Sequence, residues 1–488
     1  MNTKRYTILH SNDMHGDFFA EVAEGGGKLI GGLALLSGYI NKVRSEEENV
    51  LYVISGDMVQ GNIIDSEYKG VSTIEIMNYL APDVVALGNH EFDYGLPHLL
   101  FLEKMAHFPI VNANLYIKKY NQRLMKPYLI LNKATFDILF TGIITEKVMH
   151  SIAQDSLISS FVSIEEASRE VGKICNAYKD SDIDLTILLT HIGLDSDIEL
   201  AKLLKPEWGV DMIIGGHSHS WLTEPLIVNG VLIAQCGTGT DQIGRFDIVV
   251  DDDTNSIVEF KWKAITIDND IAEPDGELTK YINSYKEVVD RKYNSIICKL
   301  AEKLTHPARE EESTLGNLYA DALAENGECD VMLLGSGSIR VKELGPLVTL
   351  SDFVSSFPYN DYIRRFYIKG SQLKRIFAHI MRPQNRTGKG VCFQVNAGVK
   401  AVYNDKNKNL ESLHVKGEPV DDNKAYSVCL QGYHFNNSWA NLNISRDELL
   451  ALGISRVVTT STHDVLDEYL RNNQNAARRI EGRLIYKK

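Results

Sequence analysis

Disulfide-type cysteine spacing, long apolar runs and excess positive charge are all missing from this chain. The six cysteines among 488 residues show neither a CxxC pair nor the spacing of a disulfide framework, so we interpret them as free, mostly buried thiols. No stretch reaches the roughly 20 uninterrupted apolar residues that span a bilayer, and we expect no membrane anchor. With 51 Lys and Arg against 65 Asp and Glu, the net charge of −14 argues against a nucleic-acid polymer or anionic lipid as partner. An anionic substrate would therefore need a local source of positive charge.

What remains is the composition of a soluble globular protein. A composition of 44% hydrophobic and 24% charged residues excludes a disordered or collagen-like chain, and the length predicts two to four domains. The chain enters a strand-like segment at Tyr6, which leaves no room for a signal peptide and predicts a cytoplasmic protein. A mature secreted domain re-cloned behind a new Met would look the same, although the lack of disulfide spacing favours a reducing compartment. Nothing in the sequence indicates the oligomeric state.

Short runs of Val, Ile and Leu alternate with longer amphipathic stretches through the first half of the chain. This alternation predicts an α/β domain around a buried sheet. The residue pattern then changes and predicts a hairpin of two strands, at residues 244–250 and 257–267. We place the end of this domain at residue 270. The strands expected before the hairpin are Tyr6–His10, Val50–Ser55, Asp83–Leu87, Ile138–Ile144, Leu185–Thr190, Met212–Ile214 and Val231–Gln235.

A helix and a second domain follow. Apolar residues at helical spacing in Glu277–Asn294 predict a linker helix, within a linker at 271–297. Residues 298–488 are then a smaller α+β domain. Its expected helices are Leu315–Asn326 and Gly370–Met381, and its expected strands lie near Val331–Leu334, Val391–Tyr403 and Tyr426–Leu430.

Five polar motifs each follow one of the predicted strands of the first domain. Ligands of α/β sheets gather at the carboxyl ends of the strands, so we expect the five to meet at one edge. The motifs are Asp13-Met14-His15-Gly16, Ser55-Gly56-Asp57-Met58-Val59-Gln60-Gly61, Gly88-Asn89-His90-Glu91-Phe92-Asp93, Thr190-His191-Ile192-Gly193 and Gly215-Gly216-His217-Ser218-His219.

These motifs offer two Asp, four His and one Asn as oxygen and nitrogen ligands. Asp13 and His15 are two residues apart at a strand end, as are His217 and His219, so each pair is expected to aim at one ion. Glycines beside the ligands let the backbone turn sharply and approach a bound group. The ligand number exceeds one tetrahedral site and predicts two divalent ions that share the Asp57 carboxylate.

The order DxH, GDxxxG, GNHE, a His after a strand and GHxH resembles the calcineurin-like metallophosphoesterases. The segments ILHSNDMHG and GNHEFDYG are similar to the 5′-nucleotidase branch of that family. Three weaker matches in the second half follow the same order, namely Gly335-Ser336-Gly337-Ser338-Ile339-Arg340, Ser356-Phe357-Pro358-Tyr359-Asn360 and Lys416-Gly417-Glu418-Pro419-Val420. The resemblance implies a four-layer α/β/β/α sandwich for the first domain, with a substrate-binding second domain.

The resemblance also implies roles for the residues of the five motifs. Metal one would be held by Asp13, His15, Asp57 and His219, and metal two by Asp57, Asn89, His191 and His217. The ions would be Mn, Zn, Mg or Fe. His90, oriented by Asp93, would stabilise charge on the reacting phosphate rather than bind metal, which agrees with a strand-end His beside a ligating Asn.

In the second domain, the resemblance makes Arg340 and Asn360 polar contacts to a nucleoside, and Phe393 one of two rings that sandwich the base. The family's GGDGY segment is absent here, and residues 432–439 read GYHFNNSW. Tyr433 can still stack on a base, and Asn436 or Asn437 is a candidate to replace the missing ribose-binding Asp. Core packing is an equal alternative for the rings of Phe393 and Tyr433. For Arg340, the alternative is a structural salt bridge.

We therefore expect a dinuclear metallophosphohydrolase that converts a nucleoside 5′-monophosphate to nucleoside and phosphate. The nucleophile would be a metal-bridging hydroxide that attacks in line without a covalent intermediate. Alternative substrates are 2′,3′-cyclic nucleotides and nucleotide sugars, because two ions serve monoesters and diesters alike. A nucleotide-binding protein without activity is the alternative outside the enzymes, and the complete ligand set argues against it.

Overall fold

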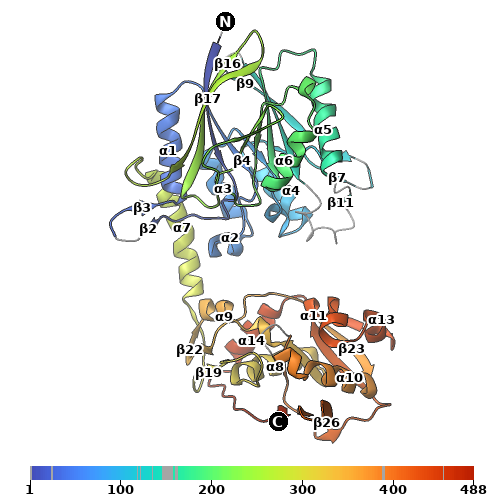
Figure 1. Cartoon of the computed structure of the whole chain (residues 1–488). Coiled ribbons are helices and arrows are strands. Elements are labelled where there is room, and N and C mark those ends of the chain that lie inside the picture. Colours follow the sequence, from blue (N-terminus) through green and yellow to red (C-terminus); the bar gives the residue numbers. More distant parts are fainter. Residues whose placement is uncertain are drawn as a thin grey trace. The chain divides into compact units, whose positions relative to one another are not determined.

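Two six-stranded sheets form the core of the first unit of this computed structural model (Figure 1). The structure describes all residues except 1–2, 24–25, 118, 121, 134–135, 145–157, 160–162, 387–390 and 454. The chain divides into two units, Met1–Val289 and Asp290–Lys488. The sheet order of the first unit positions the five polar motifs.

The first sheet has the order β17-β16-β1-β4-β5-β6, and the second has the order β14-β15-β13-β12-β10-β9. The first comprises β17 (Ser256–Thr266), β16 (Gln242–Asp251), β1 (Thr3–Ser11), β4 (Val50–Ser55), β5 (Val84–Ala86) and β6 (Ile110–Val111). The second comprises β14 (Leu226–Val228), β15 (Val231–Ala234), β13 (Met212–Ile214), β12 (Leu185–His191), β10 (Phe136–Ile144) and β9 (Tyr128–Lys133). Strands β1, β4, β5 and β6 run parallel, as do β10, β12, β13 and β15.

The inner faces of the two sheets pack against each other. Alternate residues of β1, β4, β10 and β12 supply this shared core, among them Tyr6, Val53, Phe140 and Ile187, all at most 2% exposed. Strands that are buried on both faces read as continuous apolar runs, which is why the sequence showed them clearly. The predicted strands, including the hairpin β16–β17, are confirmed with ends shifted by a few residues.

Helices cover both outer faces. Helices α1 (Leu33–Glu46) and α3 (Val71–Leu80) lie with the first sheet, and α5 (Ile164–Ala177) and α6 (Leu194–Leu203) pack on the second. The first unit is therefore a four-layer α/β/β/α sandwich, as the resemblance implied. The remaining elements are α2 (Ile63–Tyr68), η1 (His90–Phe92), α4 (Leu96–Met105), η2 (Pro206–Trp208) and the short strands β2 (Glu21–Val22), β3 (Leu29–Ile30), β7 (Tyr116–Ile117), β8 (Gln122–Arg123) and β11 (Ile158–Ser159).

Helix α7 (Gly276–Tyr293) is the predicted linker helix, and the two units divide inside it, after Val289. It is fastened to the first unit by polar contacts to α3. The hydroxyls of Tyr281 and Tyr285 both donate to the Glu75 carboxylate, the first over 2.6 Å. These polar contacts add to the packing of the three buried residues of the helix, Leu278, Ile282 and Val289.

The second unit is an α+β domain with a five-stranded sheet, β24-β20-β28-β23-β29, and a four-stranded sheet, β27-β26-β25-β30. One face of the five-stranded sheet packs on α8 and α14, and the other on α10. The strands are β18 (Ile296–Lys299), β19 (Leu304–Thr305), β20 (Val331–Gly335), β21 (Glu343–Leu344), β22 (Leu347–Thr349), β23 (Ile363–Lys369), β24 (Phe393–Val395), β25 (Val399–Asn404), β26 (Asn409–Val415), β27 (Glu418–Pro419), β28 (Ala425–Gln431), β29 (Ser455–Thr459) and β30 (Leu484–Lys487). The helices are α8 (Thr314–Gly327), η3 (Ser336–Ser338), α9 (Leu350–Ser356), α10 (Gly370–Ile380), η4 (Pro383–Arg386), α11 (Gly432–Asn436), α12 (Ser438–Leu442), α13 (Arg446–Leu450) and α14 (Thr462–Asn472).

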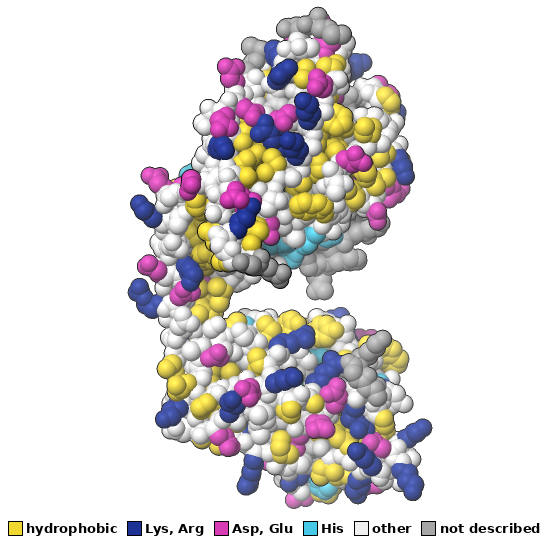
Figure 2. Space-filling model, turned by 60° about the vertical axis from the view of Figure 1, so that its left-hand side comes forward, with side chains coloured by type: hydrophobic (Ala, Val, Ile, Leu, Met, Phe, Trp, Pro, Cys, Tyr) yellow, Lys and Arg dark blue, Asp and Glu magenta, His cyan; other side chains and the backbone are white. Residues whose placement is uncertain are grey.

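On the face of each unit that Figure 2 shows, positive and negative side chains are interspersed. Among the described residues, no helix is long and apolar enough to cross a membrane.

Candidate metal centre and active site

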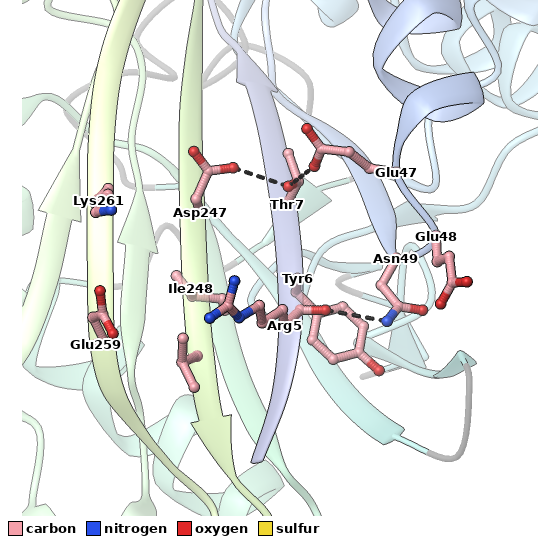
Figure 3. A pocket seen from close by; sticks show the side chains of 11 residues that line it. Arg5, Tyr6, Thr7, Glu47, Glu48, Asn49, Asp247, Ile248, Glu259 and Lys261 are labelled. Carbon is pink, nitrogen blue, oxygen red and sulfur yellow. Dashed lines mark hydrogen bonds between the residues drawn. The ribbon is translucent and has the colours of Figure 1, made fainter.

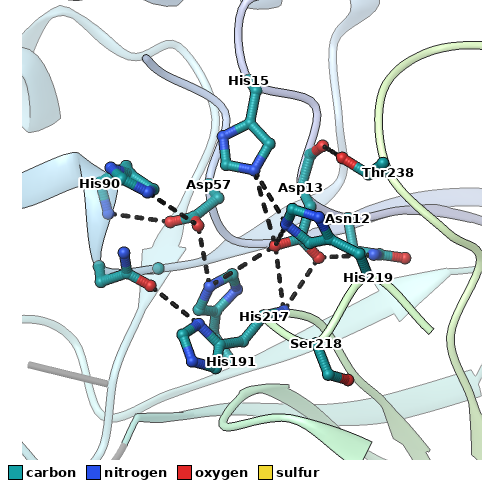
Figure 4. A network of polar contacts seen from close by, with 12 residues as sticks. Asn12, Asp13, His15, Asp57, His90, His191, His217, Ser218, His219 and Thr238 are labelled. Carbon is teal, nitrogen blue, oxygen red and sulfur yellow. Dashed lines mark hydrogen bonds and ion pairs between the residues drawn. The ribbon is translucent and has the colours of Figure 1, made fainter. Parts of the chain in front are cut away.

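The five motifs meet at the carboxyl-terminal edge of the two sheets. Asp13 and His15 follow β1, Asp57 follows β4, Asn89 and His90 follow β5, His191 ends β12, and His217 and His219 follow β13. All these parent strands run parallel to a neighbour, so their ends lie at one edge (Figure 4). The expected convergence of these seven predicted metal ligands and His90 is therefore found.

The local backbone differs from the one expected. The pairs Asp13 with His15 and His217 with His219 were expected to share a face because residues two apart in an extended strand do so. Instead all four, like Asp57, lie in loops with positive φ angles, between 49° and 79°. Residues other than glycine rarely adopt positive φ angles. Such a backbone conformation costs of order 1–3 kcal/mol per residue and persists only where surrounding contacts impose it. The pairs converge through tight turns rather than strand pleating.

Glycines beside the ligands are required by close packing. A Cβ on Gly88 would lie 2.2 Å from Oδ1 of Asp57, and a Cβ on Gly56 would lie 2.7 Å from Nδ1 of His191. Both distances are too short for a methyl group. The expected close backbone approach is therefore used to pack the ligand loops against each other.

One group of ligands surrounds the Oδ1 atom of Asp13. Nε2 of His219 lies 3.4 Å from this oxygen and Nε2 of His15 lies 4.0 Å from it, and the two Nε2 atoms are 3.2 Å apart. These three residues can present one ligand atom each to a single ion. They are the ligands assigned to metal one, apart from the shared Asp57.

A second group surrounds Asp57. Nε2 of His191 lies 3.1 Å from Oδ2 of Asp57 and 3.8 Å from Oδ1 of Asp13. Close by, Nδ1 of His217 lies 3.1 Å from Oδ1 of Asn89, and the rings of His191 and His217 are 5.4 Å apart. These are the residues assigned to metal two. Both Asp13 and Asp57 belong to more than one possible ligand group, so two carboxylates lie between the two sets.

His191 shows that the donor set fits a cation. Its Nδ1 donates to the backbone oxygen of Ser55 over 2.8 Å, which leaves a lone pair on Nε2. That atom is buried and makes no hydrogen bond of good geometry to the described residues, although Oδ2 of Asp57 lies 3.1 Å from it. Burial alone would lower the pKa of His191, but the carboxylates of Asp57 and Asp13 raise it to about 9. The cluster thus stabilises positive charge at this point, as nitrogen and oxygen ligands of a divalent ion do.

His90 and Asp93 form the pair that the resemblance implied. Nδ1 of His90 donates to Oδ2 of Asp93 over 2.7 Å, and this bond raises the pKa of the imidazole. The backbone N–H of His90 donates to Oδ1 of Asp57 over 2.9 Å, and Nε2 of His90 lies 4.0 Å from Oδ2 of Asp57. His90 also belongs to a possible ligand group with His15 and Asp57, so its ring faces the cluster.

Sequence reasoning missed Glu91, which holds the Asp57 loop. This carboxylate is 3% exposed and accepts three backbone N–H bonds, from Asp57 (3.0 Å), Met58 (2.7 Å) and Gly88 (2.7 Å). Burial, and then the charge of Asp57, raise its pKa to about 7. The sequence signal that could have found Glu91 is its place in the Gly88–Asp93 motif, where it is an acidic residue without a predicted ligand role.

Glu91→Gln should therefore weaken metal binding. An amide would turn an NH₂ group toward at least one of the backbone donors, so the Asp57 loop would shift. We expect a loss of metal affinity of about 10–100-fold, which is typical when a group supporting a ligand is changed. Titration of the metal-free protein with Mn²⁺ measures it. Glu103→Gln, in a partly exposed ion pair with Lys104, is the matched control; equal affinities for both variants would contradict the role of Glu91.

The second unit contains a cavity of about 750 Å³. Three of the four predicted substrate residues, Arg340, Asn360 and Tyr433, line it. Phe393 does not: it is 4% exposed on β24, with its ring 4.8 Å from that of His434 inside the core. The prediction that Phe393 stacks on a base is wrong for this arrangement. Its side chain points to the core face of the sheet, while the neighbouring Cys392 reaches the cavity.

Two further cavity residues were missed, Tyr359 and Arg309. Tyr359 is 49% exposed and Tyr433 is 63% exposed, so both rings are available to a ligand. Nη2 of Arg340 donates to the Tyr359 hydroxyl over 2.5 Å, and its guanidinium lies 5.1 Å from the centre of that ring. Tyr359 stood inside the quoted Ser356–Asn360 motif, which was the signal that could have found it.

The two asparagines considered as ribose contacts differ. Asn436 lines the cavity, whereas Nδ2 of Asn437 donates to the backbone oxygen of Tyr433 over 2.8 Å. Asn437 therefore supports the loop that carries Tyr433, and Asn436 is the one of the two placed to meet a ligand.

Another cavity, of about 500 Å³, lies at the opposite end of β1 in the first unit (Figure 3). Residues of both charges line it, including Arg5, Glu47 and Lys261, and Oγ1 of Thr7 donates to Oδ1 of Asp247 over 3.0 Å. These residues lie near the start of β1, away from the edge where α/β sheets bind ligands.

Comparison with known proteins agrees with this geometry. Residues 6–221 match the calcineurin-like phosphoesterase family, and residues 296–440 match the 5′-nucleotidase C-terminal domain. A 5′-nucleotidase-related protein of Glossina morsitans morsitans is 26% identical, covering 98% of this chain and 94% of that protein. The 5′-nucleotidase of Mus musculus is also 26% identical, covering 98% of this chain and 90% of that protein.

Solved structures show the same fold over the whole chain. The 5′-nucleotidase precursor from Thermus thermophilus has a TM-score of 0.62 at 22% identity and covers 99% of both chains. A putative 5′-nucleotidase from Staphylococcus aureus has a TM-score of 0.64 at 19% identity, covering 99% of this chain and 100% of that one.

The sandwich fold and the ligand cluster define a metallophosphoesterase, an enzyme that hydrolyses phosphate esters with divalent ions. The chain belongs to the 5′-nucleotidase family, with a calcineurin-like phosphoesterase domain followed by a 5′-nucleotidase C-terminal domain. The sequence resemblance predicted this family.

Proposed function

We propose that the protein is a 5′-nucleotidase that hydrolyses nucleoside 5′-monophosphates to nucleosides and phosphate. The observation that carries the proposal is the pairing of two features in one chain. Seven candidate nitrogen and oxygen ligands, with Asp13 and Asp57 among them, gather beside the His90–Asp93 pair. A separate domain holds a cavity lined by two arginines and two exposed tyrosines. The relatives named 5′-nucleotidases support this substrate class.

We assign one divalent ion to Asp13, His15, Asp57 and His219, and the other to Asp57, Asn89, His191 and His217. Two such ions supply a water nucleophile with a lowered pKa and positive charge for the phosphate oxygens. They also provide the positive charge that a chain of net charge −14 lacks. The protein contributes the fixed positions of the ligands, which Glu91 and the tight loops maintain.

His90 is assigned to the reacting phosphate. Its bond to Asp93 fixes the tautomer with hydrogen on Nδ1 and favours the protonated ring, so Nε2–H can donate to a phosphate oxygen. That donor strengthens as negative charge builds up in the transition state. We assign the cavity of the second unit to the nucleoside, with Tyr359 and Tyr433 as stacking rings and Arg309, Arg340, Asn360 and Asn436 as polar contacts.

The test is a phosphate-release screen of the purified protein with Mn²⁺, Zn²⁺ or Mg²⁺. We expect 5′-monophosphates to give the highest kcat/KM among 5′-monophosphates, 2′,3′-cyclic nucleotides, nucleotide sugars and p-nitrophenyl phosphate. A preference for cyclic nucleotides or nucleotide sugars would select the alternative substrates. Equal rates on all esters would refute recognition of the nucleoside.

Tyr359→Ala and Tyr433→Ala should each raise KM for nucleotides. Stacking of a base on an aromatic ring contributes about 1–3 kcal/mol, so each variant should lose roughly 5–150-fold in kcat/KM. Hydrolysis of p-nitrophenyl phosphate, which has no base, should hardly change.

Phe393→Ala is the contrasting variant. Because its ring is in the core, we expect it to lower the free energy of unfolding by about 3–5 kcal/mol while the remaining folded enzyme keeps its KM. Kinetics on both substrates together with urea unfolding separate the two effects. Loss of activity on both substrates in the tyrosine variants would show that these rings are structural.

A further inference from the structure

Two of the six cysteines lie side by side in the second unit, although they are far apart in the sequence. Cys429 is in the middle of β28 and is fully buried, and Cys329 follows the C-terminal end of α8 and is partly exposed. A Cβ built on Gly327 would lie 2.7 Å from Sγ of Cys429 and 3.8 Å from Sγ of Cys329. Both sulfur atoms therefore lie over the same glycine, and the absence of a side chain there makes room for them.

The contacts of the two thiols place them in one small group. Sγ of Cys329 lies 3.9 Å from the backbone oxygen of Ala324, and Sγ of Cys429 lies 4.0 Å from that of Gly327, both in the last turn of α8. The neighbouring Cys329 thiol, followed by burial, raises the pKa of the Cys429 thiol. Because both sulfur atoms lie within 4 Å of one position above Gly327, the two side chains are neighbours.

Two cations flank the pair. The Arg365 guanidinium donates to the backbone oxygen of Gly327 over 2.9 Å, beside Cys429. The Lys416 ammonium lies near Cys329 and forms an ion pair with Asp330 at 2.6 Å. Thiolates are the reactive form in disulfide exchange, and Cys329 is the partly exposed thiol of the pair, which a small disulfide can reach.

We propose that Cys329 and Cys429 form a thiol–disulfide exchange site, which small disulfides such as glutathione disulfide convert to an intrachain disulfide. Cys329 is the entry point, because it is partly exposed whereas the other five cysteines are buried, including Cys392, which lines the cavity. Because both sulfur atoms lie over Gly327, the second step is intramolecular and joins neighbouring side chains.

The reaction has two exchange steps. The Cys329 thiolate attacks one sulfur of glutathione disulfide, which forms a mixed disulfide and releases one glutathione thiolate that takes up the proton lost by Cys329. The Cys429 thiolate then attacks Sγ of Cys329, and the second glutathione leaves with the proton of Cys429. Two protein thiols are oxidised, and one glutathione disulfide is reduced to two glutathione molecules. Excess glutathione drives both steps in reverse.

The product would connect the end of α8 to β28 covalently. Strand β28 leads directly to Gln431 and Tyr433, which line the cavity of this unit. The site therefore fixes the strand that supports the cavity, independently of which substrate the cavity takes.

Peptide mapping tests the proposal directly. The folded protein is incubated with glutathione disulfide, alkylated and digested with trypsin without reduction. We expect the peptide Glu310–Arg340, which contains Cys329, to be linked to Ala425–Arg446, which contains Cys429, each carrying a single cysteine. The free thiol count should fall by two. A mixed disulfide on Cys329 as the end product, or linkage to a different cysteine as the main product, would overturn the proposal.

The dependence on glutathione concentration gives a second readout. An intrachain disulfide consumes one glutathione disulfide and releases two glutathiones, so the oxidised fraction depends on [GSH]²/[GSSG]. At a fixed ratio of the two forms, tenfold dilution of both should therefore raise the ratio of oxidised to reduced protein tenfold. A mixed disulfide would depend only on the ratio [GSH]/[GSSG], and an unchanged fraction on dilution would contradict the proposal.

Variants complete the test. Cys329→Ser changes a partly exposed residue and should abolish the linked peptide. Cys298→Ala removes a buried cysteine whose Sγ lies 3.9 Å from the backbone oxygen of Asn473. This variant should leave the linked peptide unchanged. Oxidation in 6 M urea controls for native geometry: it should distribute Cys329 among several partners. The same yield of the Cys329–Cys429 link in urea would show that the fold does not direct the pairing.

Discussion

Asp57→Asn should abolish hydrolysis of every phosphate ester tested. The Asp57 carboxylate contacts His191 at 3.1 Å and accepts the backbone N–H of His90, so it organises both the ligand cluster and the catalytic pair. An amide removes the negative charge that the shared ligand brings to two ions. We expect a loss of kcat/KM larger than the roughly 10²–10³-fold that removal of a single electrostatic stabiliser costs.

Metal content and kinetics on a nucleotide and on p-nitrophenyl phosphate measure this effect. Both activities should fall together, and bound metal at saturation should drop below two ions per chain. Asp180→Asn, in an exposed position, is the matched control and should keep both ions and both activities. Full activity of Asp57→Asn, or two tightly bound ions in it, would refute the shared-ligand assignment.

His90→Ala should lose rate while it keeps both ions. The His90 ring is oriented by Asp93 and faces the cluster, and a positioned acid or charge stabiliser contributes about 10²–10⁴-fold. Asp93→Asn should cause a smaller loss in the same direction, because it weakens the bond that fixes the ring. Single-turnover kinetics with metal analysis on the same samples separate the chemical step from metal retention.

The geometry makes this a sharp test, because His90 also belongs to a possible ligand group with His15 and Asp57. Loss of one ion in His90→Ala would mean that the residue is a ligand rather than a catalytic group. His107→Ala changes an exposed histidine and should behave like the unmodified enzyme.

The sequence alone determined the class of fold and the set of candidate metal ligands. Strands buried on both faces, such as Val50–Ser55, give continuous apolar runs that can be recognised without a structure. Because parallel strands end at a common edge, the polar residues that follow each run could be assembled into one site, from Asp13 to His219. The cytoplasmic location and the identity of the ions stay predictions.

Only the tertiary structure decided how the ligands converge and which residues surround the cavity. Asp13 and His15 meet through positive φ angles, which depend on the packing of neighbouring loops and leave no periodic signal. Phe393 and Tyr359 are both aromatic and both near matched motifs, yet the sheet buries one and the loop exposes the other. The bonds of Glu91 to the Asp57 loop and the meeting of Cys329 and Cys429 over Gly327 join distant segments. Sequence spacing carries no record of such pairs because the fold alone brings them together.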